Sequence, residues 1–282
     1  MSHIRPLERI VTGHPATDGA GVRLTRVIGT PECRHLDPFL MLDEFKSDRE
    51  DDYIAGFPEH PHRGFETVTY LLAGRVRHAD SVGNRGLLGP GAVQWMTAGR
   101  GIIHSEMPER EQGLLWGYQL WVNLPSHLKM SAPRYQDIPA ERIPAVQDQG
   151  WRARVISGEL QGVAGPAQSV TGILYLDVAL EPGMRFELPL ADALRVLVFA
   201  VEGEVASAAS SGFPRLRVHQ LGVFGQGETL ALRGGERGGR VLVLAGRPLD
   251  EPIVQYGPFV MNSPEEIQQA ILDYQRGVLD RV

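Results

Sequence analysis

Cysteine, lysine and long hydrophobic runs are scarce in this chain of 282 residues. The single cysteine, Cys33, excludes an intramolecular disulfide framework, and a reducing, cytoplasmic environment is the expected location. No stretch approaches the ~18 apolar residues that cross a bilayer, and the chain does not open with a basic segment followed by an apolar one. We therefore expect a soluble protein with neither a membrane partner nor a signal peptide.

Positive charge is also limited, because Lys46 and Lys129 are the only lysines among 28 basic residues. The formal net charge is −6, and the arginines are scattered along the sequence. A protein that binds nucleic acid normally has a concentrated basic face. We therefore expect no direct binding to nucleic acid, and we interpret the preference for arginine as coding bias.

Short runs typical of strands, separated by glycine and proline, dominate the sequence. Runs rich in β-branched or aromatic residues predict strands at 67–72, 92–96, 116–122, 174–178 and 195–201. The 33 glycines and 20 prolines interrupt these runs at short intervals, which is typical of a sandwich or a barrel. The order of strand, glycine turn and strand recurs in both halves, which indicates two copies of one β-barrel.

We predict an all-β fold of two β-barrel domains followed by one helix. A proline-rich stretch at 125–144 is the predicted connector. The predicted domains are therefore an N-terminal metal-binding barrel at 1–135 and a C-terminal barrel at 136–282, which includes the helix.

The helix is predicted at 264–276 from the pattern at its start. Ser263 can cap the helix, Pro264 suits the first helical position, and Glu266 can reach back to complete a capping box. Apolar residues with helical spacing follow, so we expect an amphipathic helix that packs on the barrels.

Two short motifs carry candidate metal ligands. His60 and His62 are separated by one residue, as are His104 and Glu106. In a strand, residues two apart project from the same face. Two such pairs on neighbouring strands would converge inside a barrel, where three neutral imidazoles and a carboxylate suit a divalent transition metal. We therefore predict one such metal per chain.

Glu66 is a second candidate carboxylate. It has the same parity as His60 and His62, and so could face the same site if the strand continued. The sequence leaves the choice between Glu66 and Glu106 open.

The other histidines give weaker signals. His78 lies near Asp80 beside a predicted turn, and we interpret it as a solvated turn residue and not as a further ligand. His219 is the only histidine of the second half and has no histidine or glutamate two residues away. The second barrel is therefore predicted to lack a metal. No nucleophile elbow and no glycine-rich phosphate loop is found.

The segments 56–66 and 94–106, which contain these motifs, resemble the pirin family of the cupin superfamily. The segments 37–45 and 251–262 resemble it as well, so the resemblance extends over nearly the whole chain. It implies a bicupin fold, in which each barrel is a double-stranded β-helix, and iron, as Fe(II), as the metal. The ligands that it implies are His60, His62, His104 and Glu106.

The resemblance also implies two kinds of function. Many bacterial members are associated with quercetin 2,3-dioxygenase activity, and animal members with transcription co-regulation. The leading interpretation is a dioxygenase that opens a flavonol ring with O2, in which Glu106 accepts the proton of the 3-hydroxyl. Its ligand would be a small flat aromatic molecule. The alternative is a non-catalytic metal- or redox-sensing protein that acts through a regulatory protein partner.

Overall fold

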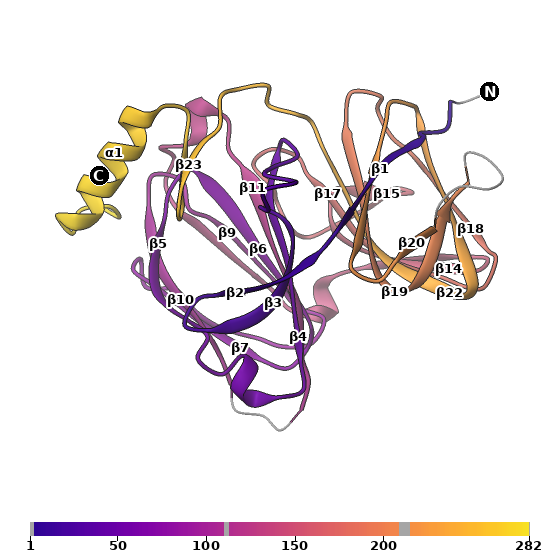
Figure 1. Ribbon diagram of the computed structural model, residues 1–282, viewed down its shortest axis with the longest axis horizontal. Helices are drawn as coiled ribbons and strands as arrows, with labels where there is room; N and C mark the ends of the chain where they lie inside the picture. The colour runs from indigo at the N-terminus through magenta and orange to yellow at the C-terminus, as the bar shows by residue number, and fades with distance from the viewer. Residues whose placement is uncertain (1–2, 110–112, 209–214, 282) are drawn as a thin grey trace. The chain divides into compact units, whose positions relative to one another are not determined.

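The computed structural model describes residues 3–109, 113–208 and 215–281 of the chain. Strands dominate these residues, and the α-helix α1 (Pro264–Gln275) lies near the C-terminus (Figure 1). The chain forms two compact units, and the strands of each unit surround a core of apolar side chains. The predicted all-β fold with a C-terminal helix is confirmed, and the five predicted runs lie in β6, β9, β11, β17 and β19, except that the run at 92–96 begins one residue before β9.

The compact units are divided differently from the predicted domains. The first barrel comprises Pro15–Glu141 and the chain from Leu249 onward, and the second comprises the chain up to His14 and Arg142–Pro248. The helix therefore belongs to the first barrel, although it follows the second in the sequence. Contacts between distant segments decide this division, such as the pairing of β1 with β21 and the ion pair of Arg63 with Asp273, and local sequence patterns do not record such contacts.

Two sheets form the first barrel. The seven-stranded sheet has the order β12 (Arg134–Ile138), β9 (Val93–Thr97), β6 (Phe65–Ala73), β11 (Leu115–Asn123), β4 (Phe39–Ser47), β3 (Val22–Ile28) and β2 (His14–Asp18). The four-stranded sheet has the order β5 (Phe57–His62), β10 (Ile102–Pro108), β7 (Val76–Asp80) and β8 (Arg85–Leu88). Short 3-10 helices occur at Glu50–Asp52, Ser126–Leu128 and Ala140–Arg142. Part of the predicted connector is therefore a strand of the first barrel.

The second barrel contains one large sheet. Its main order is β1 (Leu7–Thr12), β21 (Gln220–Phe224), β19 (Arg195–Ser207), β22 (Thr229–Gly246), β17 (Leu174–Leu180), β14 (Trp151–Ser157) and β13 (Ala145–Asp148). In addition, β18 (Arg185–Pro189) pairs with β22, β20 (Arg215–Arg217) pairs with β19, and β15 (Glu159–Leu160) pairs with β16 (Val163–Ala164).

Buried side chains attach the ends of the chain to these barrels. In the second barrel, the Arg5 guanidinium is buried and donates to the carbonyl oxygens of Gly225 at 2.7 Å and Ala191 at 2.6 Å. In the first, the Arg63 guanidinium forms a buried ion pair of 2.7 Å with Asp273 on α1. Buried guanidinium groups need several acceptors, so each contact specifies where its segment lies.

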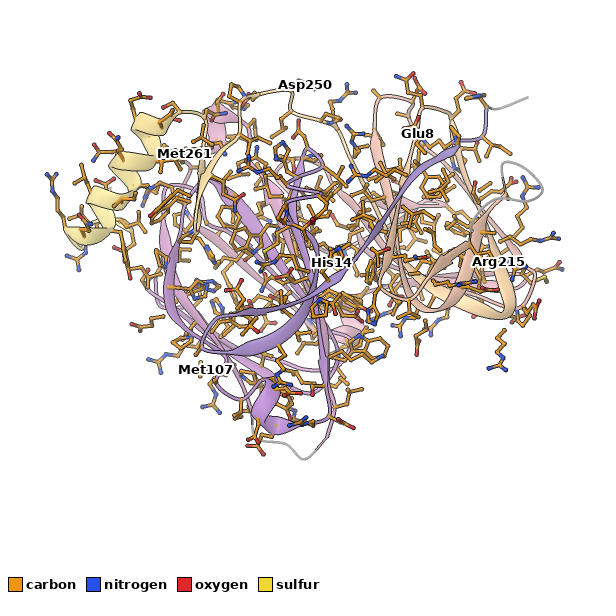
Figure 2. All side chains as sticks on the ribbon, in the orientation of Figure 1. Glu8, His14, Met107, Arg215, Asp250 and Met261 are labelled. Atoms are coloured by element: carbon orange, nitrogen blue, oxygen red, sulfur yellow. The ribbon has the colours of Figure 1, made fainter. Side chains whose placement is uncertain are left out.

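The helix docks through its apolar face on the hairpin of β23 (Val254–Tyr256) and β24 (Phe259–Met261). Met261, labelled beside α1 in Figure 2, belongs to the same buried cluster as Ile267 and Ala270. The predicted capping box is confirmed, since Ser263 and Glu266 exchange hydrogen bonds of 3.2 and 2.9 Å. No helix among the described residues is both long and apolar enough to span a membrane.

Candidate metal centre

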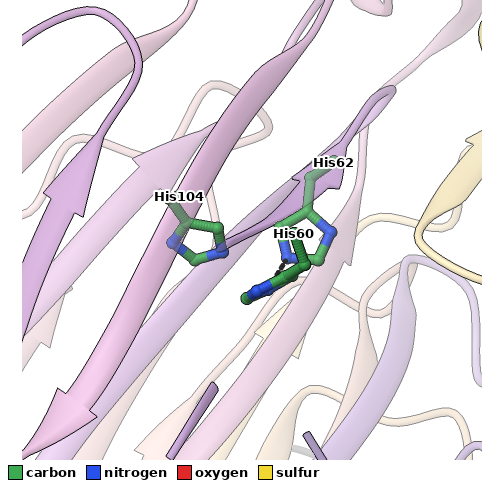
Figure 3. Close-up of side chains that lie close together, drawn as sticks. All are labelled: His60, His62 and His104. Carbon is green, nitrogen blue, oxygen red and sulfur yellow. Dashed lines mark hydrogen bonds between the residues drawn. The ribbon is translucent and has the colours of Figure 1, made fainter. Parts of the chain in front are cut away.

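Three histidine side chains converge inside the first barrel (Figure 3). Strands β5 and β10 pair antiparallel, and the register places His104 opposite His60. The ring centroids lie 4.4 Å apart for His60 and His104, 4.7 Å for His60 and His62, and 4.8 Å for His62 and His104. One nitrogen of each ring lies within 4.8 Å of the other two, so the group could hold a metal ion.

The hydrogen bonds of these rings leave lone pairs for a metal. The Nδ1 atom of His60 lies 2.8 Å from the Pro58 carbonyl oxygen and must therefore donate, which leaves Nε2 as an acceptor. That Nε2 faces the Nε2 of His62 at 3.0 Å. Among the described residues, neither ring nitrogen of the buried His104 has a hydrogen-bond partner. Buried polar atoms without partners are costly, and a metal between the rings would satisfy these nitrogens.

The surroundings favour the neutral form of two of the rings. Burial lowers the pKa of His104 well below its ordinary value, and the neighbouring His62, His60 and His78 lower it further. Burial, followed by the neighbouring His60, likewise lowers the pKa of His62. Neutral imidazole is the form that binds metals.

Glu106 lies beside this group, and both of its carboxylate oxygens accept hydrogen bonds. The Thr69 hydroxyl donates to Oε1 at 2.7 Å, and the Gln119 amide donates to Oε2 at 2.9 Å. Glu106 is buried and lines the same cavity as His60 and His62. The three histidines come together as predicted, whereas the role of Glu106 as a ligand stays a prediction.

Glu66 lies on the opposite face of a different strand. The chain turns at Gly64, where φ is +93° and an added Cβ would lie 2.0 Å from the Val260 carbonyl oxygen, so the strand of His62 does not continue to Glu66. On β6, Glu66 is three residues from Thr69, which faces Glu106, and residues three apart in a strand face opposite sides. The Glu66 carboxylate accepts from Thr97 at 2.7 Å. The shared parity of Glu66 with His60 and His62 therefore does not bring Glu66 to the site.

His78 is not the solvated residue that the sequence indicated. It lies on β7, its side chain is fully buried, and its ring centroid is 5.4 Å from that of His104. The turn begins only after Asp80, so His78 is still in the strand and faces the barrel interior. The interpretation as a solvated turn residue was wrong, because β7 continues to Asp80 and includes His78.

A cavity of about 1130 Å³ opens in the first barrel beside the histidines. His60, His62, Glu106 and Gln119 are among its polar walls, together with the ion pair of Arg26 and Asp43. Its apolar walls include Leu24, Leu40, Met41, Phe45, Phe57, Trp121 and Ile253. A cavity of this size that combines apolar walls with converging polar groups is typical of a small-molecule site.

Comparisons with known proteins extend these observations. Residues 21–122 match the family described as Pirin, and residues 175–280 match the Pirin C-terminal cupin domain. A Pirin-like protein of Caulobacter vibrioides is 51% identical over 279 residues, which cover 97% of this chain and 99% of that protein. The chain belongs to the pirin family. Its two barrels are accordingly cupin domains.

Other pirin-family relatives carry two kinds of name. Pirin of Homo sapiens is 43% identical over 267 residues, which cover 94% of this chain and 90% of that protein. A crystal structure of quercetin 2,3-dioxygenase from Acinetobacter baumannii has a TM-score of 0.89 and 36% sequence identity, and covers 98% of each chain. The family thus includes a protein described as an enzyme and proteins named without an activity.

The sequence analysis did not identify the two side chains that donate hydrogen bonds to Glu106. Thr69 and Gln119 contact Glu106 only because β6 and β11 place them directly opposite each other across the sheet. No local pattern marks them. A signal did exist for His78, because His78 and Asp80 have the same spacing of two residues as the ligand pairs.

Proposed function

We propose that this protein is a metal-dependent dioxygenase of the quercetinase type, which opens the ring of a flavonol with O2. The observation that carries the proposal is that His60, His62 and Glu106 face a cavity of about 1130 Å³ whose walls combine apolar and polar side chains. That volume admits a flat aromatic molecule beside the candidate metal ligands. The similarity to the quercetin 2,3-dioxygenase of Acinetobacter baumannii supports the choice of substrate.

One metal ion per chain would be held by His60, His62, His104 and Glu106, and we take Fe(II) as the metal. The His104 nitrogens, which have no hydrogen-bond partner in the part of the chain that the structure describes, fit such an ion. The converging Nε2 atoms of His60 and His62 fit it as well. When bound, a divalent metal would act as a Lewis acid toward the deprotonated substrate oxygen and supply redox chemistry for O2.

The side chains of the chain would bind, orient and deprotonate the substrate. Phe57 and Trp121 supply flat apolar walls for an aromatic ring. Glu106 would accept the proton of the flavonol 3-hydroxyl, since its carboxylate faces the cavity. Thr69 and Gln119 restrict its rotation by donating to both oxygens, which keeps the base oriented before the substrate arrives.

The test is consumption of quercetin by the Fe(II)-loaded protein under air. We expect loss of quercetin matched one to one by uptake of O2, with both atoms of labelled O2 recovered in the organic product. The same protein under nitrogen should leave quercetin unchanged. Fully loaded protein that binds its metal but leaves quercetin intact under air would contradict the proposal. It would favour the alternative, a metal-sensing protein that is read by a protein partner.

A further inference from the structure

A buried pair of titratable side chains, His78 and Asp80, lies beside the candidate ligand His104 and has no part in the chemistry above. Both side chains are fully buried, and the His78 Nε2 lies 3.2 Å from the Asp80 Oδ2. The His78 ring stacks on Tyr135 with centroids 4.7 Å apart and an interplanar angle of 22°. Stacking covers one face of the ring and leaves its edges free for hydrogen bonds.

Asp80 determines which nitrogen of His78 carries the hydrogen. Its Oδ1 accepts from the backbone N–H groups of Val82 at 3.2 Å and Asn84 at 2.9 Å, and its Oδ2 accepts from the Asn84 amide at 2.8 Å. A carboxylate in this position acts only as an acceptor. The Nε2 of His78 must therefore donate to Oδ2, and Nδ1 must present a lone pair. In the described part of the chain, that Nδ1 is buried without a hydrogen-bond partner.

His104 has the complementary requirement. A histidine that binds a metal through one nitrogen carries its hydrogen on the other and normally donates it to a neighbouring acceptor. Neither nitrogen of His104 has such an acceptor among the residues that the structure describes. The centroids of His78 and His104 are 5.4 Å apart, with an interplanar angle of 48°. No hydrogen bond joins the two rings among the described residues, and a small rotation of the neighbouring rings when the metal binds would bring the two nitrogens to hydrogen-bond distance.

We propose that His78, oriented by Asp80, is a positioning residue for His104. In the metal-bound protein the free N–H of His104 donates to Nδ1 of His78, and Nε2–H of His78 donates to Asp80. This relay sets the tautomer of both rings and directs the lone pair of His104 toward the metal. The inference rests on the metal site of the proposed function, and it adds two residues to that site.

The variant Asp80→Asn tests the direction of the relay with almost no change in shape. The amide oxygen should stay with the two backbone N–H groups that now bind Oδ1, which places Nδ2 against His78. The Asn84 side chain can rotate to offer its oxygen there. His78 must then accept at Nε2 and carry its hydrogen on Nδ1, where it faces the N–H of His104. An exchange of aspartate for asparagine acts through the wrong tautomer in the same way in serine proteases.

Two measurements read the result. Competition with a chelator gives the affinity for cobalt(II), which we expect to fall by about 10- to 100-fold in Asp80→Asn. Nitrogen-15 spectra of the metal-free protein report the tautomer, and we expect His78 to change from Nε2–H in the wild type to Nδ1–H in the variant. His78→Phe, which keeps the stacking on Tyr135 and removes the acceptor, should lose cobalt(II) affinity to a similar degree.

Asp52→Asn is the matched control. Asp52 is a buried carboxylate of the same barrel that accepts from Ser47 at 2.8 Å and does not line the cavity. Its affinity for cobalt(II) should stay within about twofold of the wild type.

Three results would overturn the inference. The first is wild-type affinity in folded Asp80→Asn and His78→Phe. The second is an Nδ1–H tautomer of His78 in the wild type, which decides the question even if the variants do not fold. The third is a wild-type protein that binds no metal, and only this result also removes the basis of the proposed function.

Discussion

The inward faces of the two barrels differ in polarity along register-linked rows of residues. In the first barrel, strand register connects a row of polar residues on neighbouring strands, namely Arg26, Asp43, Gln119, Thr69 and Gln94. In the second barrel, strand register connects a row without polar side chains across five strands, namely Val155, Leu176, Val243, Val198 and Gly222. The second barrel shows that a barrel of this kind needs no polar row in order to fold.

This difference in polarity distinguishes the second barrel, whose inward row only adds stability, from the first barrel, whose inward row lies at the candidate site. Buried polar groups cost free energy unless they are hydrogen-bonded, and the first barrel meets this cost with hydrogen bonds such as those of Thr69 and Gln119 to Glu106. The apolar row of the second barrel gains from burial directly. Each of the four predictions that follow changes one barrel. They compare the effect on metal binding or activity with the effect on the stability of the fold.

Removal of a candidate ligand should have the largest effect of the four, and this effect should be on the amount of bound metal and not on the fold. We expect His62→Ala and His104→Ala each to lose most of the bound metal, because a divalent ion retains few protein ligands without them. Both proteins should stay folded, since apolar clusters such as Val22, Phe45 and Leu71 form the core of the first barrel. Metal analysis and thermal unfolding check this. Variants that are unfolded at room temperature would make the metal structural.

Replacement of the two buried glutamates should have different effects on activity, because Glu106 faces the cavity and Glu66 lies on the other face of the sheet. Glu106→Gln should reduce flavonol turnover by about 10²- to 10⁴-fold, because an amide cannot accept the substrate proton. Its metal affinity should fall less, since the amide oxygen can still coordinate. Glu66→Gln changes the opposite face of the sheet and should keep the metal and part of the activity. An active Glu106→Gln variant, measured by O2 uptake, would remove Glu106 from the role of base.

A cavity in the second barrel should lower stability without affecting the site. Phe186 is fully buried, with its ring 5.0 Å from that of Trp151. Phe186→Ala should reduce the free energy of unfolding by about 3 to 5 kcal/mol, measured by denaturant titration. The affinity for cobalt(II), measured well below the unfolding midpoint, should match the wild type. A marked loss of affinity would show that the two barrels are not separable.

The smallest effect concerns pH and a buried lysine of the first barrel. Lys129 donates to the carbonyl oxygens of Gly64 and Val260 and to the Asn123 side chain, at 2.7 to 2.9 Å. Burial lowers the pKa of Lys129 to about 8 from 10.5. Between these values the unfolded chain binds more protons than the folded one, so the free energy of unfolding should rise with pH, by up to about 3 kcal/mol.

The variant Lys129→Met isolates this contribution. It should lack the rise between pH 8 and 10.5, and at pH 7 it should lose about 1 to 3 kcal/mol because three acceptors remain unpaired. Urea titrations of both proteins across this range provide the comparison. Parallel pH profiles for the two proteins would assign the rise to other groups.

Local patterns in the sequence were sufficient for five of the strands, for the helix, and for the shared face within each pair of candidate ligands. Runs rich in β-branched or aromatic residues at 67–72 and 195–201 predicted strands, and the Ser263 capping box predicted the start of α1 to the residue. Each pair of candidate ligands could be placed on one face, because strand parity is a local property. Parity was misleading where the strand ended, as at Gly64, and this is why Glu66 stayed a candidate.

The sequence by itself therefore determined the fold class, the helix and the two pairs His60–His62 and His104–Glu106. Only the tertiary structure decided that His104 lies opposite His60, that His78 is buried beside it, and that α1 belongs to the first barrel. The physical reason is the range of the interactions. Side-chain direction and helix capping depend on neighbours a few residues away, whereas register, burial and docking depend on pairing between segments that are distant in the chain.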